Sequence, residues 1–406
     1  MLRKAFHSIL VRRHFWRYAS FSEIAELYAS RMLRMAALHV AGAFMSIYLY
    51  QIGYSIVQIA IFWAAFYLFK AVMALPAAAL VARIGPKHAI LASNLLYIPA
   101  MISFAALPLV GPWLFVPILI LEGLSATLYS IAYSIDFSKV KSIEHAGKEI
   151  AYMNIIEKVT SGLSPLIGGV IAFLFGPQVV ILVAAILFAL AAVPLLRTAE
   201  PIPTHQKLQL RGFPWRLIKR HAAAQFALGF DVFSSGTVWM LFAAIVVIGL
   251  TESNDIYIAS GIILSVVLLS ALAASYVYGK LIDKSKGKDL MHYAVFFNAI
   301  THLVRPFVTT PLMVAAVNVS NEAATTGYTM PYTRAIFDNA DLSGQRTTYM
   351  GLIEVLSNLG AFAGAIALGL IAYGFGEEAA ITNFFFITAG VVLLVLTARF
   401  PLYKKS

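Results

Sequence analysis

Ionisable side chains lie inside long apolar stretches of this sequence, and they are the residues best placed to do chemistry. Glu122 and Glu322 each lie near the middle of such a stretch. A charge in an apolar medium costs roughly 2.5–3.5 kcal/mol, so such residues usually have a function or a partner. A low dielectric disfavours the charged form, which would let either carboxylate take up and release a proton. We expect at least one of them to move protons; the alternative is a structural glutamate held by hydrogen bonds.

Asp231, Arg31 and Arg34 form a second group of embedded charges. Arg31 and Arg34 lie on nearly one face of a predicted helix, and Asp231 lies in a later apolar stretch. An Arg31–Asp231 ion pair could close a gate between two parts of the molecule. The alternative is that both arginines extend to lipid headgroups.

Lys70, Glu157 and Glu354 are embedded as well. Lys70 requires a carboxylate or an anionic substrate nearby, because an isolated ammonium at that depth would lose its proton. Glu157 and Glu354 are candidates for gating or for substrate contact. Lys158 follows Glu157 directly but points about 100° away around a helix, so the two need not pair. We interpret Arg305 as structural.

Tyrosines recur along two of the apolar stretches, at Tyr129 and Tyr133 and again at Tyr328 and Tyr332. They could line a cavity that accepts amphipathic ligands, although packing alone would also explain them. No histidine pattern predicts a metal site, no phosphate-binding loop predicts ATP as the energy source, and no nucleophile–base arrangement stands out. We therefore expect no metal, no cofactor and no enzymatic activity.

The elements that must position these residues follow from composition. Hydrophobic residues make up 60% of the 406 residues and charged residues only 12%, which leaves too little polar surface for a soluble protein. A spanning helix needs about 20 apolar residues, so the sequence predicts an all-α integral membrane protein with no sizeable soluble domain. The twelve predicted spans lie at about 30–51, 55–83, 88–109, 112–135, 149–174, 177–196, 223–249, 257–281, 290–309, 311–336, 347–374 and 379–399.

Positive charge is concentrated in alternate loops. The net charge of +11 could indicate nucleic-acid binding, but the basic residues lie on one predicted side of the membrane, as the rules of membrane orientation require. The other side carries Glu252, Asp255, Glu377 and Glu378 instead. This asymmetry predicts cytoplasmic termini and argues against a nucleic-acid partner. The absence of cysteine excludes disulfides and thiolate metal sites.

The two halves of the chain resemble each other. The segment YMNIIE at 152–157 matches YMGLIE at 349–354 at four of six positions, and both spans then end in Phe-Gly. Glu322 follows Glu122 by 200 positions (322 − 122). Such a repeat predicts two pseudo-symmetric bundles of six helices. Coincidence between helices rich in Leu, Ala and Gly is the alternative.

Five segments result from these observations. We predict a cytoplasmic amphipathic segment at 1–29, an N-terminal six-helix bundle at 30–196, a cytoplasmic linker at 197–222, a C-terminal six-helix bundle at 223–400 and a cytoplasmic tail at 401–406. The first segment is basic and lacks the smooth apolar region of a cleaved signal peptide. We expect it to lie on the membrane face.

With this organisation the chain resembles the major facilitator superfamily over its whole length. The loop at 78–87 is similar to the family pattern G-x-L-x-D-R-x-G-R-K, with Arg83 and Gly85 in place but Ala82 at the acidic position. The second copy, at 279–288, fits better through Gly279 and Asp283. The resemblance implies gating roles for these residues; an ordinary polar turn is the alternative.

The fifth span also resembles the antiporter branch of this superfamily. Gly162, Pro165, Gly168 and Gly169 are similar to its G-P-x-x-G-G element, in which small residues and a proline let a helix bend and pack closely. A generic kinked helix is the alternative. The arginine that many drug antiporters carry in the fourth span is missing, and Glu122 is the charged residue that this span offers instead.

The resemblance implies a central cavity lined by the first, fourth, seventh and tenth spans, so that Glu122 and Glu322 would face the substrate. We expect a secondary active transporter that works by alternating access, is coupled to protons and exports its solute. A metabolite uptake carrier, a lipid or lysolipid flippase, and a non-transporting receptor or scaffold remain alternatives. We expect a monomer in the inner membrane of a prokaryote, with a small solute, protons and membrane lipids as its partners.

Overall fold

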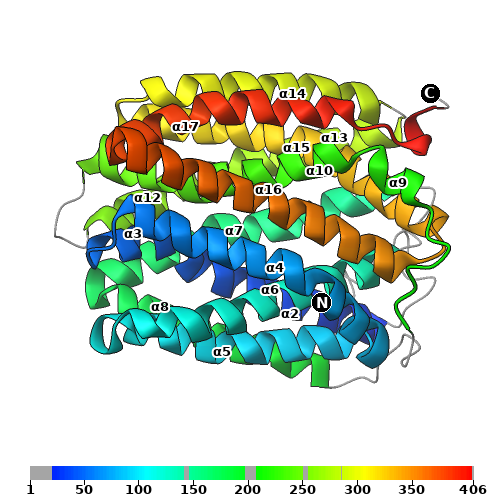
Figure 1. The fold of residues 1–406 in the computed structure, drawn as a ribbon, viewed down its shortest axis with the longest axis horizontal. Helices are drawn as coiled ribbons and strands as arrows, with labels where there is room; N and C mark the ends of the chain where they lie inside the picture. Colours follow the sequence, from blue (N-terminus) through cyan, green and yellow to red (C-terminus); the bar gives the residue numbers. More distant parts are fainter. Residues whose placement is uncertain (1–20, 141–145, 197–206, 250–254, 285, 405–406) are drawn as a thin grey trace, which may run out of the picture.

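The computed structural model describes residues 21–140, 146–196, 207–249, 255–284 and 286–404 (Figure 1). Most of the predicted amphipathic segment and the first part of the predicted linker lie outside these residues. The described part of the chain is built from helices that run roughly parallel to one another (Figure 1).

The first half of the chain forms six helical runs that coincide with the first six predicted spans. The first run begins at Phe21, upstream of the predicted start. The runs are α2 with η1 and α3 (Phe21–Ala41, Gly42–Phe44, Met45–Gln51), α4 (Ile56–Ile84), α5 (Pro86–Val110), η2 with α6 (Pro112–Leu114, Phe115–Val140), α7 (Ala146–Phe175), and α8 with η3 (Pro177–Ala192, Val193–Leu196).

The second half forms six further runs at the remaining predicted spans, after a short linker helix, α9 (Trp215–Lys219). They are α10 with η4, α11 and η5 (Ala222–Phe233, Ser234–Val238, Trp239–Phe242, Ala243–Gly249), α12 and α13 (Asp255–Ser265, Leu268–Asp283), α14 with η6 (Gly287–Val304, Arg305–Phe307), α15 (Pro311–Leu342), α16 (Arg346–Phe375), and α17 with η7 (Glu377–Val392, Leu393–Thr397). A final turn, η8 (Pro401–Lys404), follows.

Nine helical stretches among the described residues are long and apolar enough to cross a membrane. The other predicted spans fall on α12–α13, α14 and α15. The helix is interrupted between α12 and α13, and α15 carries several polar and charged side chains, Glu322 and Arg334 among them. These helices can span only if neighbouring helices shield their polar groups from lipid.

Two equivalent glycines show the repeat in three dimensions. Gly176 ends α7 and Gly376 ends α16, each with a φ of 90°. A positive φ is easily adopted by glycine alone, and it turns the chain sharply into the next antiparallel helix. Because both follow the matched segments of the fifth and eleventh spans, the repeated sequence produces a repeated helix–turn–helix.

The halves segregate into two bundles that meet along two seams (Figure 1). One seam is α4 against α16, and the other is α7 against α12 and α13. The repeat relates α4 to α13 and α16 to α7, so exchanging the halves carries one seam onto the other. This is the two-bundle pseudo-symmetry that the sequence predicts.

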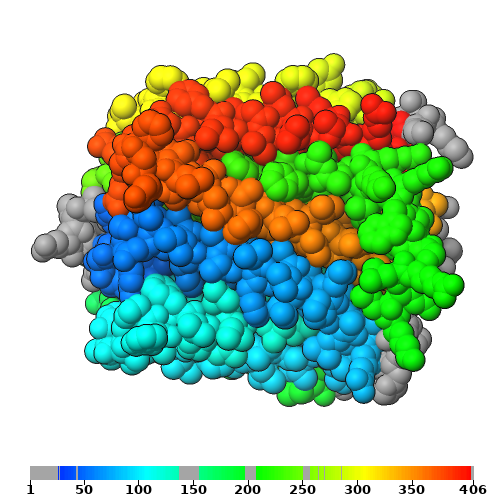
Figure 2. Space-filling model, in the orientation of Figure 1, coloured from blue at the N-terminus to red at the C-terminus, as the bar shows by residue number. Residues whose placement is uncertain are grey.

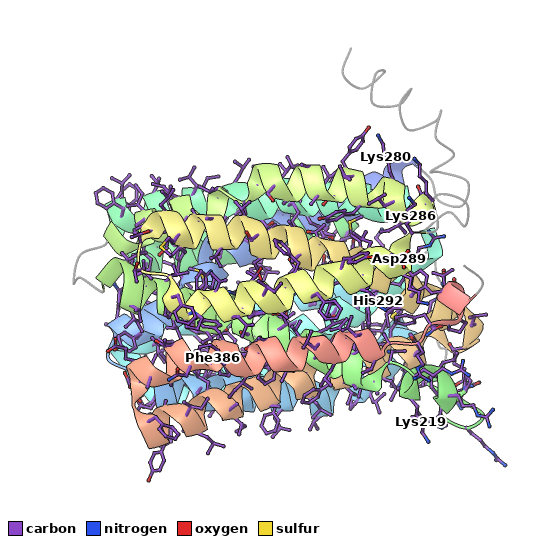
Figure 3. All side chains as sticks on the ribbon, turned by 90° about the horizontal axis from the view of Figure 1, so that it is seen from above. Lys219, Lys280, Lys286, Asp289, His292 and Phe386 are labelled. Atoms are coloured by element: carbon purple, nitrogen blue, oxygen red, sulfur yellow. The ribbon has the colours of Figure 1, made fainter. Side chains whose placement is uncertain are left out.

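The molecule has two unlike ends. The linker end carries α9, the C-terminal residues and the turns at Gly85 and Ser343–Gln345; the far end carries the turns at Gly53, Gly176 and Gly376. Lys219, Lys280 and Lys286 gather at the linker end (Figure 3).

The helices pack side by side and leave their outer faces at the surface (Figure 2), and many large apolar side chains of these helices are exposed. Leu109 is 90% exposed, Tyr373 85% and Trp113 81%. A soluble monomer rarely leaves an apolar surface of this extent in water. The exposed surface is therefore suited to lipid.

The described part of the linker lies across the start of α16. Thr348 donates a hydrogen bond to the Gln209 carbonyl at 2.9 Å, and the Arg399 amide bonds the Arg220 carbonyl at 3.0 Å. His221 is buried at the start of the second bundle, where Tyr349 lies 2.8 Å from its Nε2. Burial lowers the pKa of His221 to about 4, so this side chain is neutral at physiological pH.

Candidate functional site

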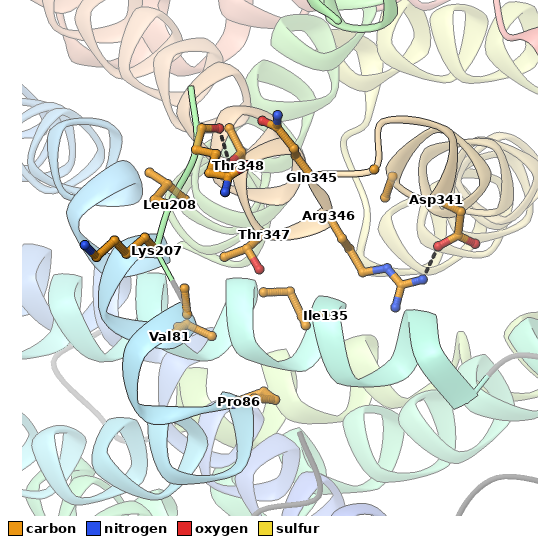
Figure 4. A pocket seen from close by; sticks show the side chains of 14 residues that line it. Val81, Pro86, Ile135, Lys207, Leu208, Asp341, Gln345, Arg346, Thr347 and Thr348 are labelled. Carbon is orange, nitrogen blue, oxygen red and sulfur yellow. Dashed lines mark hydrogen bonds and ion pairs between the residues drawn. The ribbon is translucent and has the colours of Figure 1, made fainter. Parts of the chain in front are cut away.

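A cavity opens between the two bundles at the linker end (Figure 4). Its volume is about 510 Å³. Ile135 of the first half and Arg346 and Thr348 of the second half line it, and residues 207–209 of the linker cross its mouth. The size falls within the range of small-molecule sites, so the cavity can admit a solute from this end.

The far end is closed by close helix packing between the bundles. A Cβ atom at Gly169 would lie 2.5 Å from the Tyr257 carbonyl oxygen, and one at Gly261 would lie 2.5 Å from the Pro165 carbonyl oxygen. Such contacts are possible only because both residues are glycines. The Ile56 amide also donates to Glu377 at 3.0 Å across the bundles. The structure is therefore open towards the linker end and shut at the far end.

Two ion pairs bridge the bundles between these ends. Lys158 of α7 lies 2.7 Å from Glu322 of α15, and Lys70 of α4 lies 3.7 Å from Glu354 of α16. Ser130 of α6 adds a hydrogen bond to Glu354 at 2.6 Å. In each pair the cation belongs to the N-terminal bundle and the carboxylate to the C-terminal bundle. Separation of the bundles must break both.

Arg31 pairs with Glu157 instead of Asp231. Its Nε donates to the Glu157 carboxylate at 2.7 Å, and a second nitrogen contacts the same oxygen. Arg31 also donates to the Tyr129 hydroxyl at 3.0 Å and lies 3.5 Å from the centre of the Tyr133 ring. In this structure Arg31 therefore does not form the expected ion pair with Asp231, because all three of its partners lie inside the N-terminal bundle.

Arg34 extends neither to a gate nor to lipid headgroups. It is 1% exposed, and it donates to Asn94 at 2.6 Å and to Ser93 at 3.3 Å. Its guanidinium lies 3.8 Å from the centre of the Tyr129 ring. No carboxylate pairs with it among the described residues, so neutral acceptors and an aromatic face hold this charge.

Glu122 is enclosed in the N-terminal bundle. It is 4% exposed and accepts a hydrogen bond from Tyr97 at 2.7 Å, while its other oxygen has no hydrogen-bond partner. Lys70 lies near enough to interact with it electrostatically. The expectation that Glu122 faces an open cavity is not met in this state, because α5 covers it.

Asp231 is the centre of a buried cluster in the C-terminal bundle. It accepts from Ser235 at 3.1 Å and from Asn298 at 2.9 Å, it bonds the Tyr328 hydroxyl, and it lies 2.8 Å from Nε2 of His302. Arg305 reaches Nδ1 of the same imidazole at 2.9 Å. This hydrogen bond makes Nδ1 the acceptor, so His302 is a neutral bridge between a guanidinium and a carboxylate.

Sequence reasoning missed His302 and Asn298. A signal was present, because His302 lies three positions before Arg305 in the same apolar stretch and both therefore share a helix face. Arg305 lies 4.8 Å from the centre of the Trp239 ring. That Arg305 has a structural role remains a prediction.

The clusters of Arg34 and Asp231 are related by the repeat. Arg34 of the first span is held by an asparagine of the third and a tyrosine of the fourth; Asp231 of the seventh is held by an asparagine of the ninth and a tyrosine of the tenth. The same cage therefore holds opposite charges in the two bundles. Tyr129 and Tyr328 belong to these cages, and both are buried rather than lining an open cavity.

The remaining predicted residues lie in seams and turns. Gly162 packs against Leu268 of α13, and a Cβ at Gly168 would meet the Val40 carbonyl oxygen of α2 at 2.2 Å. These residues lie at close helix contacts. At the linker end the loop residues take four different places: Arg83 is exposed, Gly85 turns the chain with a φ of 88°, Gly279 is buried in α13 and Asp283 ends that helix.

Comparison with known proteins decides the family. The model of the Major Facilitator Superfamily matches residues 27–301, well over half of the chain. The chain belongs to this superfamily. The superfamily is one of non-enzymatic carriers, and the chain is placed among them.

Curated relatives include multidrug efflux pumps. The chain is 26% identical over 225 residues to the multi-drug resistance efflux pump PmrA of Streptococcus pneumoniae, covering 53% of this chain and 55% of the pump. It is 24% identical over 255 residues to the PmrA homolog of Lactococcus lactis, covering 60% and 62%. The chain thus matches less than two thirds of each relative. These matches support a multi-pass transporter of a bacterial plasma membrane.

Solved structures share the fold over nearly the whole chain. The human organic anion transporter MFSD10 (TETRAN) superposes with a TM-score of 0.68 at 12% identity, covering 92% of this chain and 99% of that chain. The Escherichia coli fucose:proton symporter FucP gives a TM-score of 0.63 at 13% identity, covering 92% and 97%. At identities this low the matches show a shared fold and nothing more. They confirm the twelve-helix fold.

Proposed function

We propose that this protein exports an amphipathic solute in exchange for protons, across a bacterial plasma membrane, with its linker end in the cytoplasm. The observation that carries the proposal is the pair of ion bridges, Lys158–Glu322 and Lys70–Glu354, that join the bundles. A proton that binds either glutamate removes the negative charge that holds its lysine. Protonation is thereby linked to separation of the bundles, which is what coupled alternating access requires.

The orientation follows from charge. The linker end carries Lys219, Lys280 and Lys286, and the far end carries Glu377 and Glu378. Cytoplasmic loops of membrane proteins are enriched in lysine and arginine. The cavity in this structure then faces the cytoplasm, which is the state that would load a solute for export.

The direction of transport has two further supports. The glycines of α7 form the seam that shuts the far end, and they resemble the packing element of antiporters. The curated relatives are described as efflux pumps. Glu122 enters the proposal as a third proton site, since it lies beside Lys70 and has an unbonded oxygen.

Transport in proteoliposomes under an imposed pH gradient tests the proposal. The panel would contain cationic, anionic and zwitterionic amphiphiles, with wild type beside Glu322→Gln, Glu354→Gln and Glu122→Gln. We expect solute to move against the proton gradient in wild type, and the first two substitutions to uncouple it.

Glu378→Gln serves as the matched control, because it makes the same substitution at an exposed glutamate of the far end that belongs to neither bridging pair. Solute movement that ignores both the gradient and the glutamate substitutions would identify a facilitator or flippase instead.

A further inference from the structure

The two bridging ion pairs are not equally strong. Lys158 lies at hydrogen-bonding distance from Glu322, at 2.7 Å, whereas Lys70 and Glu354 are 3.7 Å apart, beyond the range of a hydrogen bond. The Glu354 carboxylate takes its hydrogen bonds from Ser130 at 2.6 Å and Asn358 at 2.8 Å instead. The Lys70 ammonium therefore balances the charge of Glu354 without a hydrogen bond, and another cation can replace it there.

Aromatic rings complete the surroundings of this ammonium. The Nζ atom of Lys70 lies 5.5 Å from the centres of both the Phe66 and the Tyr67 rings. A carboxylate on one side and ring faces on the other form an environment that attracts a cation, and it suits an organic cation better than a small hydrated ion. Neither Lys70 nor Glu354 is sealed, since their side chains are 14% and 13% exposed.

From this geometry we propose that Glu354, Phe66 and Tyr67 form a binding site for an amphipathic organic cation, and that Lys70 is the tethered occupant of this site when no substrate is bound. The proposal rests on the transport function proposed above and names the substrate class. The incoming cation displaces the lysine ammonium from Glu354. The lysine keeps the carboxylate compensated in the empty carrier, where an unpaired charge would be costly.

The neighbouring charges favour a cation over an anion. Glu122 also interacts with Lys70. A bound cation that displaces the ammonium is therefore attracted by the carboxylates of both Glu354 and Glu122. An anion would have to approach Lys70 against both of them. The other bridging lysine, Lys158, has no aromatic ring within cation–π distance among the described residues, and Glu322 holds it more closely.

Two probes of the same shape and opposite charge test the inference. Binding of tetraphenylphosphonium and of tetraphenylborate would be measured on the purified full-length protein at constant pH. We expect the cation to bind wild type and the anion to bind far more weakly. Removal of the competing lysine by Lys70→Met should tighten tetraphenylphosphonium binding about tenfold, the order expected for one partly buried charge.

Matched variants separate this effect from a general change in structure. Lys70→Arg keeps a resident cation and should bind the probe as wild type does. Lys219→Met removes an exposed lysine of the linker helix α9 and should leave the affinity within about threefold of wild type. Glu354→Gln should abolish binding, and it tests the site even if Lys70→Met does not fold.

Three results would overturn the inference: unchanged or weaker cation binding in a folded Lys70→Met protein, full binding in Glu354→Gln, or tetraphenylborate binding that depends on Lys70. The last would assign the site to anionic amphiphiles. Failure here is distinct from failure of the proposed function, because proton-coupled transport of another solute would persist if only the cation site is wrong.

Discussion

At the scale of single residues, three embedded cations of the N-terminal bundle lie over aromatic rings. Arg31 lies 3.5 Å from the centre of Tyr133, Arg34 lies 3.8 Å from that of Tyr129, and Lys70 has two rings at 5.5 Å. An aromatic face attracts a cation without adding a charge of its own. It can therefore lower the cost of burying a cation in a helix bundle that has few carboxylates to spare.

The Arg31–Glu157 pair should be essential to stability. Arg31→Met leaves the Glu157 carboxylate without its partner in a mostly buried site, so we expect a loss of about 3–5 kcal/mol in the free energy of unfolding. Thermal unfolding in detergent measures it. The double variant with Glu157→Gln should recover part of the loss. Asp341→Asn, which breaks the exposed Arg346–Asp341 pair, is the control and should cost about 0–1 kcal/mol.

If the double variant is as unstable as Arg31→Met alone, loss of the packing around Arg31, rather than an uncompensated charge, is the cause.

The sequence showed that these charges are embedded, because any ionisable residue in an apolar span is visible by inspection. It could not show their partners. Arg31 and Glu157 lie 126 positions apart, and the rotation of each helix about its axis decides which side chains meet.

At the scale of elements, glycine determines where helices can approach. The far-end seam brings α7 against α12 through Gly169 and Gly261, each set against a backbone carbonyl of the other helix. The three glycines of the span-five element were predictable as packing residues from their small size and spacing. Their partners were not, since α12 and α13 lie in the other half of the chain.

Gly169→Ala should prevent full closure of the far end. The new Cβ would lie 2.5 Å from the Tyr257 carbonyl oxygen, a distance that real Cβ atoms do not tolerate, so the bundles must separate there. The chain has no cysteine, so spin labels can be attached to Gln58→Cys and Glu378→Cys, both exposed at the far end. Pulsed electron resonance should report a longer distance in the variant.

Gly374→Ala provides the control for that measurement, because nothing lies within 4 Å of a Cβ at this position. It should leave the distance distribution unchanged. An unchanged distribution in Gly169→Ala as well would mean that the seam relaxes around the methyl group and does not set the closed state.

At the scale of the whole molecule, the number and order of spans were predictable and the confirmed fold agrees with them. Each span is a run of apolar residues bounded by charge, glycine or proline, and this pattern is local. The exact ends were less predictable, since α15 extends past its predicted end to Leu342 through the polar residues Asp338, Asn339 and Asp341 at the linker end. The sequence also could not predict which end of the molecule is open and which is closed, because this depends on packing between the two halves.

Orientation in the membrane gives a test on intact cells. Single cysteines would replace Glu378 at the far end and Lys286 at the linker end, both exposed. A maleimide that cannot cross the membrane should label the first position from outside and the second only after permeabilisation, since the basic end is cytoplasmic. The reverse labelling pattern would mean that the basic linker end lies outside the cell, so that the open cavity faces outwards.

The pairing of embedded charges has a consequence for the energy source. Arg31–Glu157, Lys70–Glu354, Lys158–Glu322 and the Arg305–His302–Asp231 bridge each sum to zero. A membrane voltage does little work on groups that move together with zero net charge, so these four groups add little voltage dependence to the return of the empty carrier, whereas Arg34 keeps a charge that no carboxylate pairs with among the described residues. One added positive charge changes this: carried across the whole field, it is worth about 2.3 kcal/mol per 100 mV. Voltage therefore acts on what the carrier has bound and on Arg34, and hardly at all on the paired groups.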